Sequence, residues 1–494
     1  MELAEELYIC YYKMFYSNNN SKLNNTHQEL SIVVSFFYFV LLAFAIFFYK
    51  ERLCTDTAYY FYKIINEKNL HVEHQRYVQA FAEFPVLIAM YLHASLQTCV
   101  LVYSIAHVIF FAVIAFLLLW RYNNIFYALL ILSLQLIGIV WGAVNPIVEH
   151  YYGTALLVAF YCILINTKKI NIFTLLLLLI LAFLGLTSHP YNLVLFIFLL
   201  TFLYLSNIQK KQLLYFVLLV PVFILFKKNN TSIYETEKIN WIFNITRNKH
   251  YLQLLSAAWW FHFCKMLLLY YWHLLLIFFT TLYVLLKQGK NIHALVTLTF
   301  FLLACFIINF SYDISTMSGY IEQVYFLLSP LVLIPFFSMV LPSIYIGAKR
   351  KIILPIMSII LLVCATKQYF LLHHFTSKTK IFLAWNQIAQ AKTGCKFILP
   401  TNVLLPYDQF INWDMPFVTH LLSAMQFSKQ TTLVPAMDNN ILLIQSLKSN
   451  EYLFRNNEIG EIDMLNNIYL HLCTDSIYYA WYCLTFCFFP STYP

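Results

Sequence analysis

Long apolar stretches separated by short polar ones set the pattern of this chain. A helix needs about 20 apolar residues to cross the hydrocarbon core of a bilayer, with a working range of about 17–25. Eleven stretches meet or approach that length, at residues 31–49, 95–119, 123–143, 147–166, 171–186, 190–206, 212–226, 263–286, 292–310, 321–345 and 352–366. The pattern therefore predicts an all-α polytopic membrane protein with about eleven transmembrane helices.

The polar connections between these stretches predict the orientation. Short loops rich in Lys and Arg stay on the cytoplasmic side of a membrane. Five short connections carry ten cations and no acid: Arg121, Lys168, Lys169, Lys210, Lys211, Lys287, Lys290, Lys349, Arg350 and Lys351. The alternate short connections, 144–149, 187–190 and 311–320, contain no Lys or Arg. We therefore expect an integral protein of a plasma or inner membrane, with a cytoplasmic N-terminus and an extracytoplasmic C-terminus.

This orientation divides the chain into three parts. Residues 1–30 form a cytoplasmic segment, 31–366 the transmembrane domain and 367–494 a small extracytoplasmic C-terminal region. Within the transmembrane domain, two long outer loops are expected at 50–94 and 227–262. The apolar spacing in the first of them is typical of interface helices, which lie in the membrane plane with one apolar face.

Three short elements are predicted in the C-terminal region. Lys396–Pro400 and Thr431–Pro435 have the composition of strands, and Phe417–Phe427 that of a helix between them. The last apolar stretch, Ile477–Phe489, has only 13 residues and is too short to be expected to cross a membrane. We expect it to pack on the protein or at the interface.

Composition excludes the main soluble classes. Only 11% of the residues are charged and 61% are hydrophobic, whereas soluble domains carry about 25% charged residues. This rules out a soluble enzyme and a nucleic-acid-binding module. The net charge of +9 follows from the topology, because the inner connections hold ten of the 31 cations and no acid. We therefore expect the bilayer, and no nucleic acid, as a partner.

The acids that remain gather at the outer ends of the predicted helices, and Asp56 comes first. It follows the first span by a few residues, which places its carboxylate at the membrane surface near lipid headgroups. A carboxylate there can act as a general base toward an acceptor hydroxyl, or help to hold a divalent cation beside a phosphate. The alternative is structural, since Asp is a preferred N-cap residue for a helix beginning at Thr57.

Three further residues are candidates for the same outer site. Arg76 can grip a phosphate through two of its N–H groups, and its structural alternative is a surface salt bridge with Glu73. Glu149 is a second outer acid, at a helix start where the helix dipole also favours negative charge. His189 lies in a tight outer turn before Pro190, as a second candidate phosphate ligand or only a turn residue.

The arrangement resembles the GT-C glycosyltransferases, integral-membrane enzymes that use polyprenyl-phosphate-linked sugars. The matching sequence is Thr55-Asp56-Thr-Ala-Tyr-Tyr, then His74-Gln-Arg76-Tyr, and Asn145-Pro followed by Glu149-His150. The resemblance implies that Asp56 is the catalytic base or metal-organising acid, Glu149 a second acid, and Arg76 a ligand of the lipid phosphate. Some members carry Asp-x-Asp in these loops, where this chain has Thr-Asp-Thr.

The function implied by this resemblance is transfer of a sugar, with inversion, from a polyprenyl-phosphate donor to a glycan, lipid or protein acceptor on the outer face. Whether the reaction requires a divalent cation, Mg²⁺ or Mn²⁺, held by Asp56 and Glu149 is left open. Two alternatives remain. A transporter or flippase for a lipid-linked substrate predicts a path from the outer acids to His107 and His273. A scaffold without chemistry predicts that Asp56, Glu149 and His189 do not converge.

Overall fold

Helices make up nearly all of the described chain from Asn20 to Gln390. The computed structural model describes residues 20–206, 210–232, 235–237, 240, 257–311, 319–345, 350–400, 413–436, 446–455, 458–466, 468–473 and 479–480. Residues 1–19 of the predicted segment 1–30, much of loop 227–262 and most of Ile477–Phe489 lie outside these residues, whereas 20–30 already belong to the first described helix.

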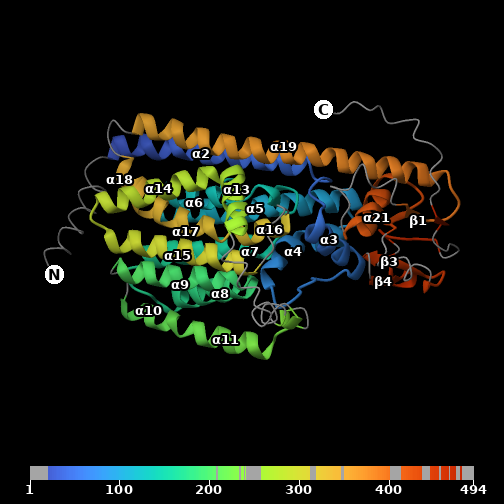
Figure 1. The fold of residues 1–494 in the computed structure, drawn as a ribbon, viewed down its shortest axis with the longest axis horizontal. Helices are drawn as coiled ribbons and strands as arrows, with labels where there is room; N and C mark the ends of the chain where they lie inside the picture. Colours follow the sequence, from blue (N-terminus) through green and yellow to red (C-terminus); the bar gives the residue numbers. More distant parts are fainter. Residues whose placement is uncertain are drawn as a thin grey trace.

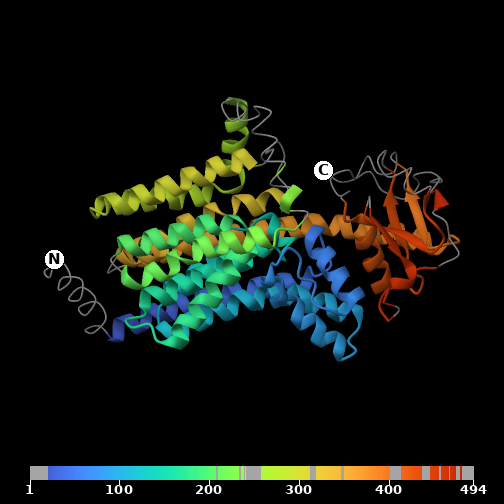
Figure 2. The same ribbon diagram turned by 90° about the horizontal axis from the view of Figure 1, so that it is seen from below.

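The helices in chain order are α2 (Asn20–Phe47), α3 (Thr55–Glu67), α4 (Ala80–Tyr91), α5 (Leu96–Tyr122), α6 (Ile125–Leu136), α7 (Glu149–Asn166), α8 (Ile172–Ser188), α9 (Tyr191–Leu205), α10 (Lys210–Val217), α11 (Leu219–Asn229), α13 (Ala257–Tyr270), α14 (Trp272–Lys287), α15 (Asn291–Ser311), α16 (Gly319–Tyr325), α17 (Leu328–Pro335), α18 (Leu341–Ile344), α19 (Arg350–Gln390) and α21 (Met415–Gln426). Short 3-10 turns stand at Tyr77–Gln79, Trp141–Ala143 and Ile462–Met464, and a π-helical turn, Phe336–Val340, links α17 to α18. Figures 1 and 2 show most of the helices running along the long axis.

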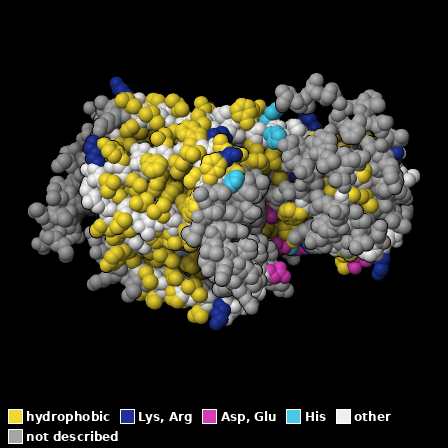
Figure 3. Space-filling model, in the orientation of Figure 1, with side chains coloured by type: hydrophobic (Ala, Val, Ile, Leu, Met, Phe, Trp, Pro, Cys, Tyr) yellow, Lys and Arg dark blue, Asp and Glu magenta, His cyan; other side chains and the backbone are white. Residues whose placement is uncertain are grey.

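Several helices are long and apolar enough to cross a membrane. Five described stretches meet both criteria, and the α13–α14 pair, bent by 93°, is a sixth if it forms one crossing. Each of the eleven predicted apolar runs coincides with at least one helix, but α6, α8 and α9 are shorter than a usual span. Apolar side chains cover the helical body on the face in Figure 3. The chain is therefore an integral membrane protein with an essentially all-helical body.

Helix α19 differs from the span predicted at 352–366. It continues to Gln390 and has 41 residues, or about 60 Å at a rise of about 1.5 Å per residue. That is roughly twice the thickness of a bilayer core. It lies beside α2 along the bundle, where the Phe44 and Tyr369 rings meet with centroids 5.9 Å apart (Figure 1). Its second half leads to the C-terminal unit.

Residues 50–94, predicted to form the first outer loop, contain two helices with different surroundings. Helix α4 exposes Phe81, Phe84, Ile88 and Tyr91, spaced three or four residues apart, so it keeps the lipid-facing side expected of an interface helix. Helix α3 was expected to lie in the interface as well, but its residues 57–62 are all buried within the protein. Protein packing on more than one side, rather than lipid, therefore surrounds α3.

The C-terminal unit is a small α/β fold. Strand β1 (Lys396–Leu399) pairs in parallel with β2 (Thr432–Pro435) and with β5 (Tyr479–Ala480), and α21 connects β1 to β2. A separate hairpin is formed by β3 (Glu451–Arg455) and β4 (Glu458–Glu461). The two strands and the helix predicted from the sequence are confirmed. A disulfide between Cys395 and Cys473 closes the unit.

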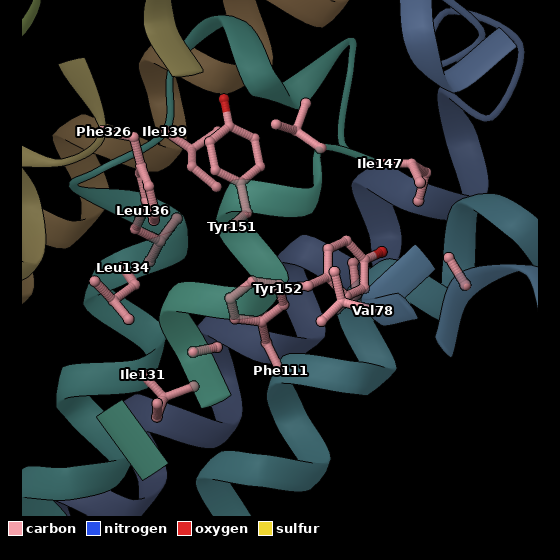
Figure 4. Close-up of a cluster of buried hydrophobic side chains, with 14 of the residues drawn as sticks. Val78, Phe111, Ile131, Leu134, Leu136, Ile139, Ile147, Tyr151, Tyr152 and Phe326 are labelled. Atoms are coloured by element: carbon pink, nitrogen blue, oxygen red, sulfur yellow. The ribbon is translucent and has the colours of Figure 1, made fainter. Parts of the chain in front are cut away.

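A cluster of buried side chains surrounds the first turns of α7. Tyr151 and Tyr152 lie among side chains from α5, α6 and the loop before α7, including Phe111, Leu136 and Ile147 (Figure 4). All five are nearly inaccessible to solvent. This packing fixes the helix whose first residue is Glu149.

Helices α7 and α8 approach closely at Gly153, which gives a stability prediction. A methyl group on Gly153 would overlap Ser188, whose hydroxyl donates to the Gly185 carbonyl over 2.6 Å, and would lie 2.6 Å from the amide nitrogen of Asn192. Small residues allow such close contact between membrane helices. We expect Gly153→Ala to destabilise the protein by about 1–3 kcal/mol in detergent unfolding, and the added change Ser188→Gly to restore part of the loss. A Gly153→Ala protein as stable as the wild type would contradict this packing.

Candidate functional site

Asp56 lies in the first turn of α3 and is not the N-cap. Cys54 occupies that position, and no side chain caps the helix end, so the capping interpretation of Asp56 is wrong. The side-chain amide of Gln323 donates to its carboxylate over 3.1 Å. Desolvation and then the charge of Glu149 raise the pKa of Asp56 to about 6, although Gln323 and Arg76 act in the opposite direction. At neutral pH the carboxylate is therefore ionised but only weakly held in that form, which suits a general base.

Asn145 connects the segment of Asp56 to the short connection 144–149 that precedes α7. Its side-chain oxygen accepts from the backbone N–H of Thr57 over 2.9 Å and from the Thr57 hydroxyl over 2.7 Å. The same hydroxyl oxygen accepts from the backbone N–H of Ile147 over 3.0 Å. Because Asn145 and Thr57 are both buried, the first turn of α3 is held against the segment that leads into α7.

Glu149 begins α7 and forms an ion pair with Arg76. One of its oxygens accepts from the Tyr60 hydroxyl at 2.7 Å, the Gln79 amide at 2.8 Å and the Arg76 guanidinium at 3.1 Å. The side chain of Glu149 is 3% exposed and that of Arg76 13%. Burial lowers the pKa of Arg76, but Glu149, Tyr60 and Glu235 together raise the pKa of the guanidinium above its ordinary value.

The surface salt bridge that the sequence offered as an alternative for Arg76 is therefore wrong. Glu73 instead accepts from the Tyr59 hydroxyl over 2.5 Å and contacts the His71 ring nitrogen at 2.9 Å. Arg76 uses one terminal nitrogen for Glu149, and among the described residues its Nε has no hydrogen-bond partner. That nitrogen is a buried donor left without an acceptor inside the described part of the site.

His189 lies beside the cluster through His150. The two rings are stacked, with centroids 4.6 Å apart and planes 16° from parallel. The backbone N–H of Tyr191 points to Nδ1 of His189 over 3.3 Å, which assigns the ring proton to Nε2. Burial, followed by the charges of His150, Arg76 and Lys227, lowers the pKa of His189 well below its ordinary value. A neutral His189 can donate one hydrogen bond from Nε2.

Gln323 joins the two halves of the cluster. Its side chain binds Asp56, and its backbone carbonyl contacts Nδ1 of His150 at 2.6 Å. We call Asp56, Arg76, Glu149, His150, His189 and Gln323 the outer site, after the predicted orientation of the chain. The four sequence-predicted residues thus come together, contrary to the expectation for a scaffold without chemistry.

Sequence reasoning missed three neutral hydrogen-bond partners of the acids in this site, Tyr60, Gln79 and Gln323. Tyr60 lies in the matched segment Thr55–Tyr60 but received no role there, and Gln79 and Gln323 belong to no motif. Gln323 offered one signal, because Glu322 and Gln323 are adjacent polar residues at the start of an otherwise apolar run. Glu322 is buried beside the site and accepts from the Tyr271 hydroxyl and from two backbone N–H groups that follow α6.

A second cation lies near the outer site. Lys227, at the end of α11, donates to the backbone carbonyl of His74 and to Glu235, each over 3.0 Å. The positive charges of Lys227 and Arg76 both lower the pKa of His189. The carbonyl it binds is two residues before Arg76. The site and its surroundings therefore combine two acids with two cations at one end of the helices.

The metal and transport interpretations receive less from the geometry. Among the described residues, no group of three or more His, Cys, Asp or Glu side chains could hold a metal ion, so Asp56 and Glu149 have no third ligand in this part of the chain. His107 is bonded to Tyr152 at 3.2 Å, and His273 to the Ile137 carbonyl at 3.1 Å. Both are structural hydrogen bonds of buried rings.

Figure 3 shows acidic side chains gathered where the helical body meets the C-terminal unit. The residues of the outer site come from the loops and helix ends that follow α2, precede α7 and follow α8, together with α16.

Protein families, curated proteins and solved structures give no match to this chain. The chemistry of the outer site therefore rests on its own geometry.

Proposed function

We propose that this protein is a membrane glycosyltransferase that moves a sugar from a polyprenyl-phosphate donor to an acceptor on the extracytoplasmic face. The observation that carries the proposal is the convergence of Asp56, Arg76, Glu149 and His189 from three separate connections. A single ion pair would explain Arg76 and Glu149 alone. It would not explain a second acid with a pKa near neutrality or an unpaired guanidinium nitrogen beside it.

The proposed mechanism assigns one role to each side of the site. The Asp56 carboxylate takes the proton of an acceptor hydroxyl as its oxygen attacks the anomeric carbon of the sugar. The bond from that carbon to the phosphate oxygen breaks, and polyprenyl phosphate leaves with the electron pair. Arg76 and the Nε2–H of His189 bind the leaving phosphate. One displacement of this kind inverts the anomeric centre, and no step requires a metal.

The proposed topology places this reaction outside the cytoplasm. Eleven crossings, with N-terminus inside and C-terminus outside, follow from the loops rich in Lys and Arg. Two observations support this. The exposed apolar side of α4 suits the outer edge of a bilayer. The disulfide Cys395–Cys473 suits an oxidising compartment, where such bonds persist.

A transfer assay on the full-length protein in lipid nanodiscs tests the proposal. The probes are a panel of polyprenyl-phosphate sugars radiolabelled in the sugar, with glycan, lipid and peptide acceptors. We expect the wild type to release polyprenyl phosphate and Asp56→Asn to lose about 10²–10⁴-fold in rate, the usual contribution of a general base. Activity of the wild type should rise with pH through about 6, because Asp56 must lose its proton to act and its pKa is raised to about 6.

The matched control is Asp463→Asn, which changes an exposed aspartate of the C-terminal unit and should leave the rate unchanged. Full activity in Asp56→Asn would remove Asp56 from the mechanism. Movement of the labelled lipid across a vesicle membrane without release of polyprenyl phosphate would support the transporter or flippase instead.

A further inference from the structure

A buried ion pair connects α19 to the C-terminal unit beside the first residues of α3. The Lys378 ammonium lies 3.1 Å from Oδ2 of Asp414, and their side chains are 5% and 0% exposed. Lys378 also contacts the sulfur of Cys54, at 3.7 Å. Cys54 is two residues before Asp56, so Lys378 contacts the segment that carries the proposed catalytic base.

Asp414 makes a second contact, to the backbone at the start of α3. The N–H of Thr55 donates to the same Oδ2 over 2.7 Å. Thr55 has a φ of 46°, in the left-handed region that residues with a branched side chain rarely adopt. An unfavourable backbone angle of this kind persists only where the surroundings hold it. The residue that follows is Asp56.

The orientation of Asp414 argues against an ordinary capping role. Asp414 occupies the N-cap position of α21, where an aspartate usually accepts from the N–H groups of its own helix. No side-chain cap bond is formed there. The carboxylate instead binds a backbone amide that is 359 residues away in sequence.

Other contacts already attach the C-terminal unit to α3. The Tyr62 hydroxyl is 3.0 Å from Nδ1 of His420. Asn466 binds the C-terminal end of α3. Its backbone N–H donates to the side-chain oxygen of Asn66 over 2.9 Å, and its side-chain amide donates to the Ile65 carbonyl over 2.6 Å. Docking of the unit therefore does not depend on Asp414. A buried ion pair is also a poor source of stability compared with apolar residues of similar volume.

We propose that Asp414, held in place by Lys378, is a positioning residue that fixes the Thr55 amide and thereby the carboxylate of Asp56. The C-terminal unit is then part of the catalytic assembly rather than an appended module. The catalytic half of this inference rests on the proposed function, whereas the positioning half concerns the backbone of Thr55 alone.

Two paired substitutions separate positioning from folding. Asp414→Leu with Lys378→Met removes both charges and also the acceptor for Thr55, leaving no unpaired buried charge. Asp414→Asn with Lys378→Met removes the same charges but keeps a side-chain oxygen at that place. Both proteins are expected to fold, so a difference between them reports the hydrogen bond to Thr55.

The first measurement is hydrogen–deuterium exchange of the full-length protein in nanodiscs, over peptides covering residues 54–60. We expect the Leu/Met protein to exchange at least about 10-fold faster there than the wild type, and the Asn/Met protein to stay close to the wild type. Asn466→Ala is the matched control, since it removes a contact of the same unit at the other end of α3. It should speed exchange near residues 64–67 and leave 54–60 unchanged.

The second measurement is transfer of the radiolabelled sugar used to test the proposed function. The Leu/Met protein should lose about 10²-fold in kcat, the scale of a displaced catalytic group, with KM within about threefold of the wild type. The Asn/Met protein should recover most of that kcat. Unchanged exchange over 54–60 in the Leu/Met protein would overturn the positioning role whatever the activity. Faster exchange with an unchanged kcat would overturn its catalytic half. A wild type without transfer activity would overturn the proposed function, and the exchange result would then decide the role of Asp414.

Discussion

Replacing Arg76 with methionine is expected to destabilise the protein by about 3–5 kcal/mol, because the change leaves the Glu149 carboxylate buried without its cation. Glu149 is 3% exposed, and it would keep only the Tyr60 and Gln79 hydrogen bonds. Two neutral donors do not compensate a buried charge. The measurement is the free energy of unfolding in mixed detergent micelles.

The double variant Arg76→Met with Glu149→Leu identifies the cause. It removes both charges and should regain most of the lost stability, since apolar residues can replace a buried pair at little cost. Glu67→Gln serves as the control, because Glu67 is 38% exposed and its contacts, to Lys63 at 3.5 Å and to His71 at 3.0 Å, lie near the protein surface. Its loss should cost less than about 1 kcal/mol. If the double variant were as unstable as Arg76→Met, the ion pair would not be the source of the effect.

Removal of the disulfide has the second large effect. The bond joins cysteines separated by 78 residues, and closing a loop of that size contributes about 4 kcal/mol by restricting the unfolded chain. We expect Cys395→Ala with Cys473→Ala to lose about that much stability in the C-terminal unit. The described cysteines of the helical body are free thiols, so its resistance to protease should not change.

The measurement is limited proteolysis followed by mass spectrometry, with and without a reductant. Cleavage within residues 391–473 should become faster in the variant, and the wild type should behave in the same way once reduced. Cys264→Ser, which changes an exposed free cysteine, is the control and should alter neither pattern. A wild type that ignores the reductant would show that the disulfide does not stabilise the unit.

The apolar pattern was sufficient to predict helices but not their surroundings. The eleven apolar runs indicate where helices form, because burial in lipid or in protein requires the same composition. For that reason the sequence could not show that α3 is enclosed by protein while α4 keeps a lipid-facing side. It also could not show that α19 continues past residue 366, since Lys367 and Gln368 end the apolar run without ending the helix.

The candidate site could be located from sequence only as separate residues. Asp56, Arg76, Glu149 and His189 were singled out because ionisable groups are scarce and costly near a membrane. Their partners could not be found in this way. Arg76 and Glu149 are 73 residues apart, and Asp56 and Gln323 are 267 apart. Pairs at such separations follow no helical or strand periodicity, so only the fold reveals them.

The bond between Thr55 and Asp414 also sets an order of assembly. The amide is synthesised 359 residues before the carboxylate that holds it, and at about 5–20 residues per second that interval lasts roughly 20–70 s. During this time Thr55 exists without the carboxylate that holds its amide. Under the proposed function, a newly made chain would stay inactive until the C-terminal unit has been made and has docked, so that transfer would begin only in molecules that carry this unit.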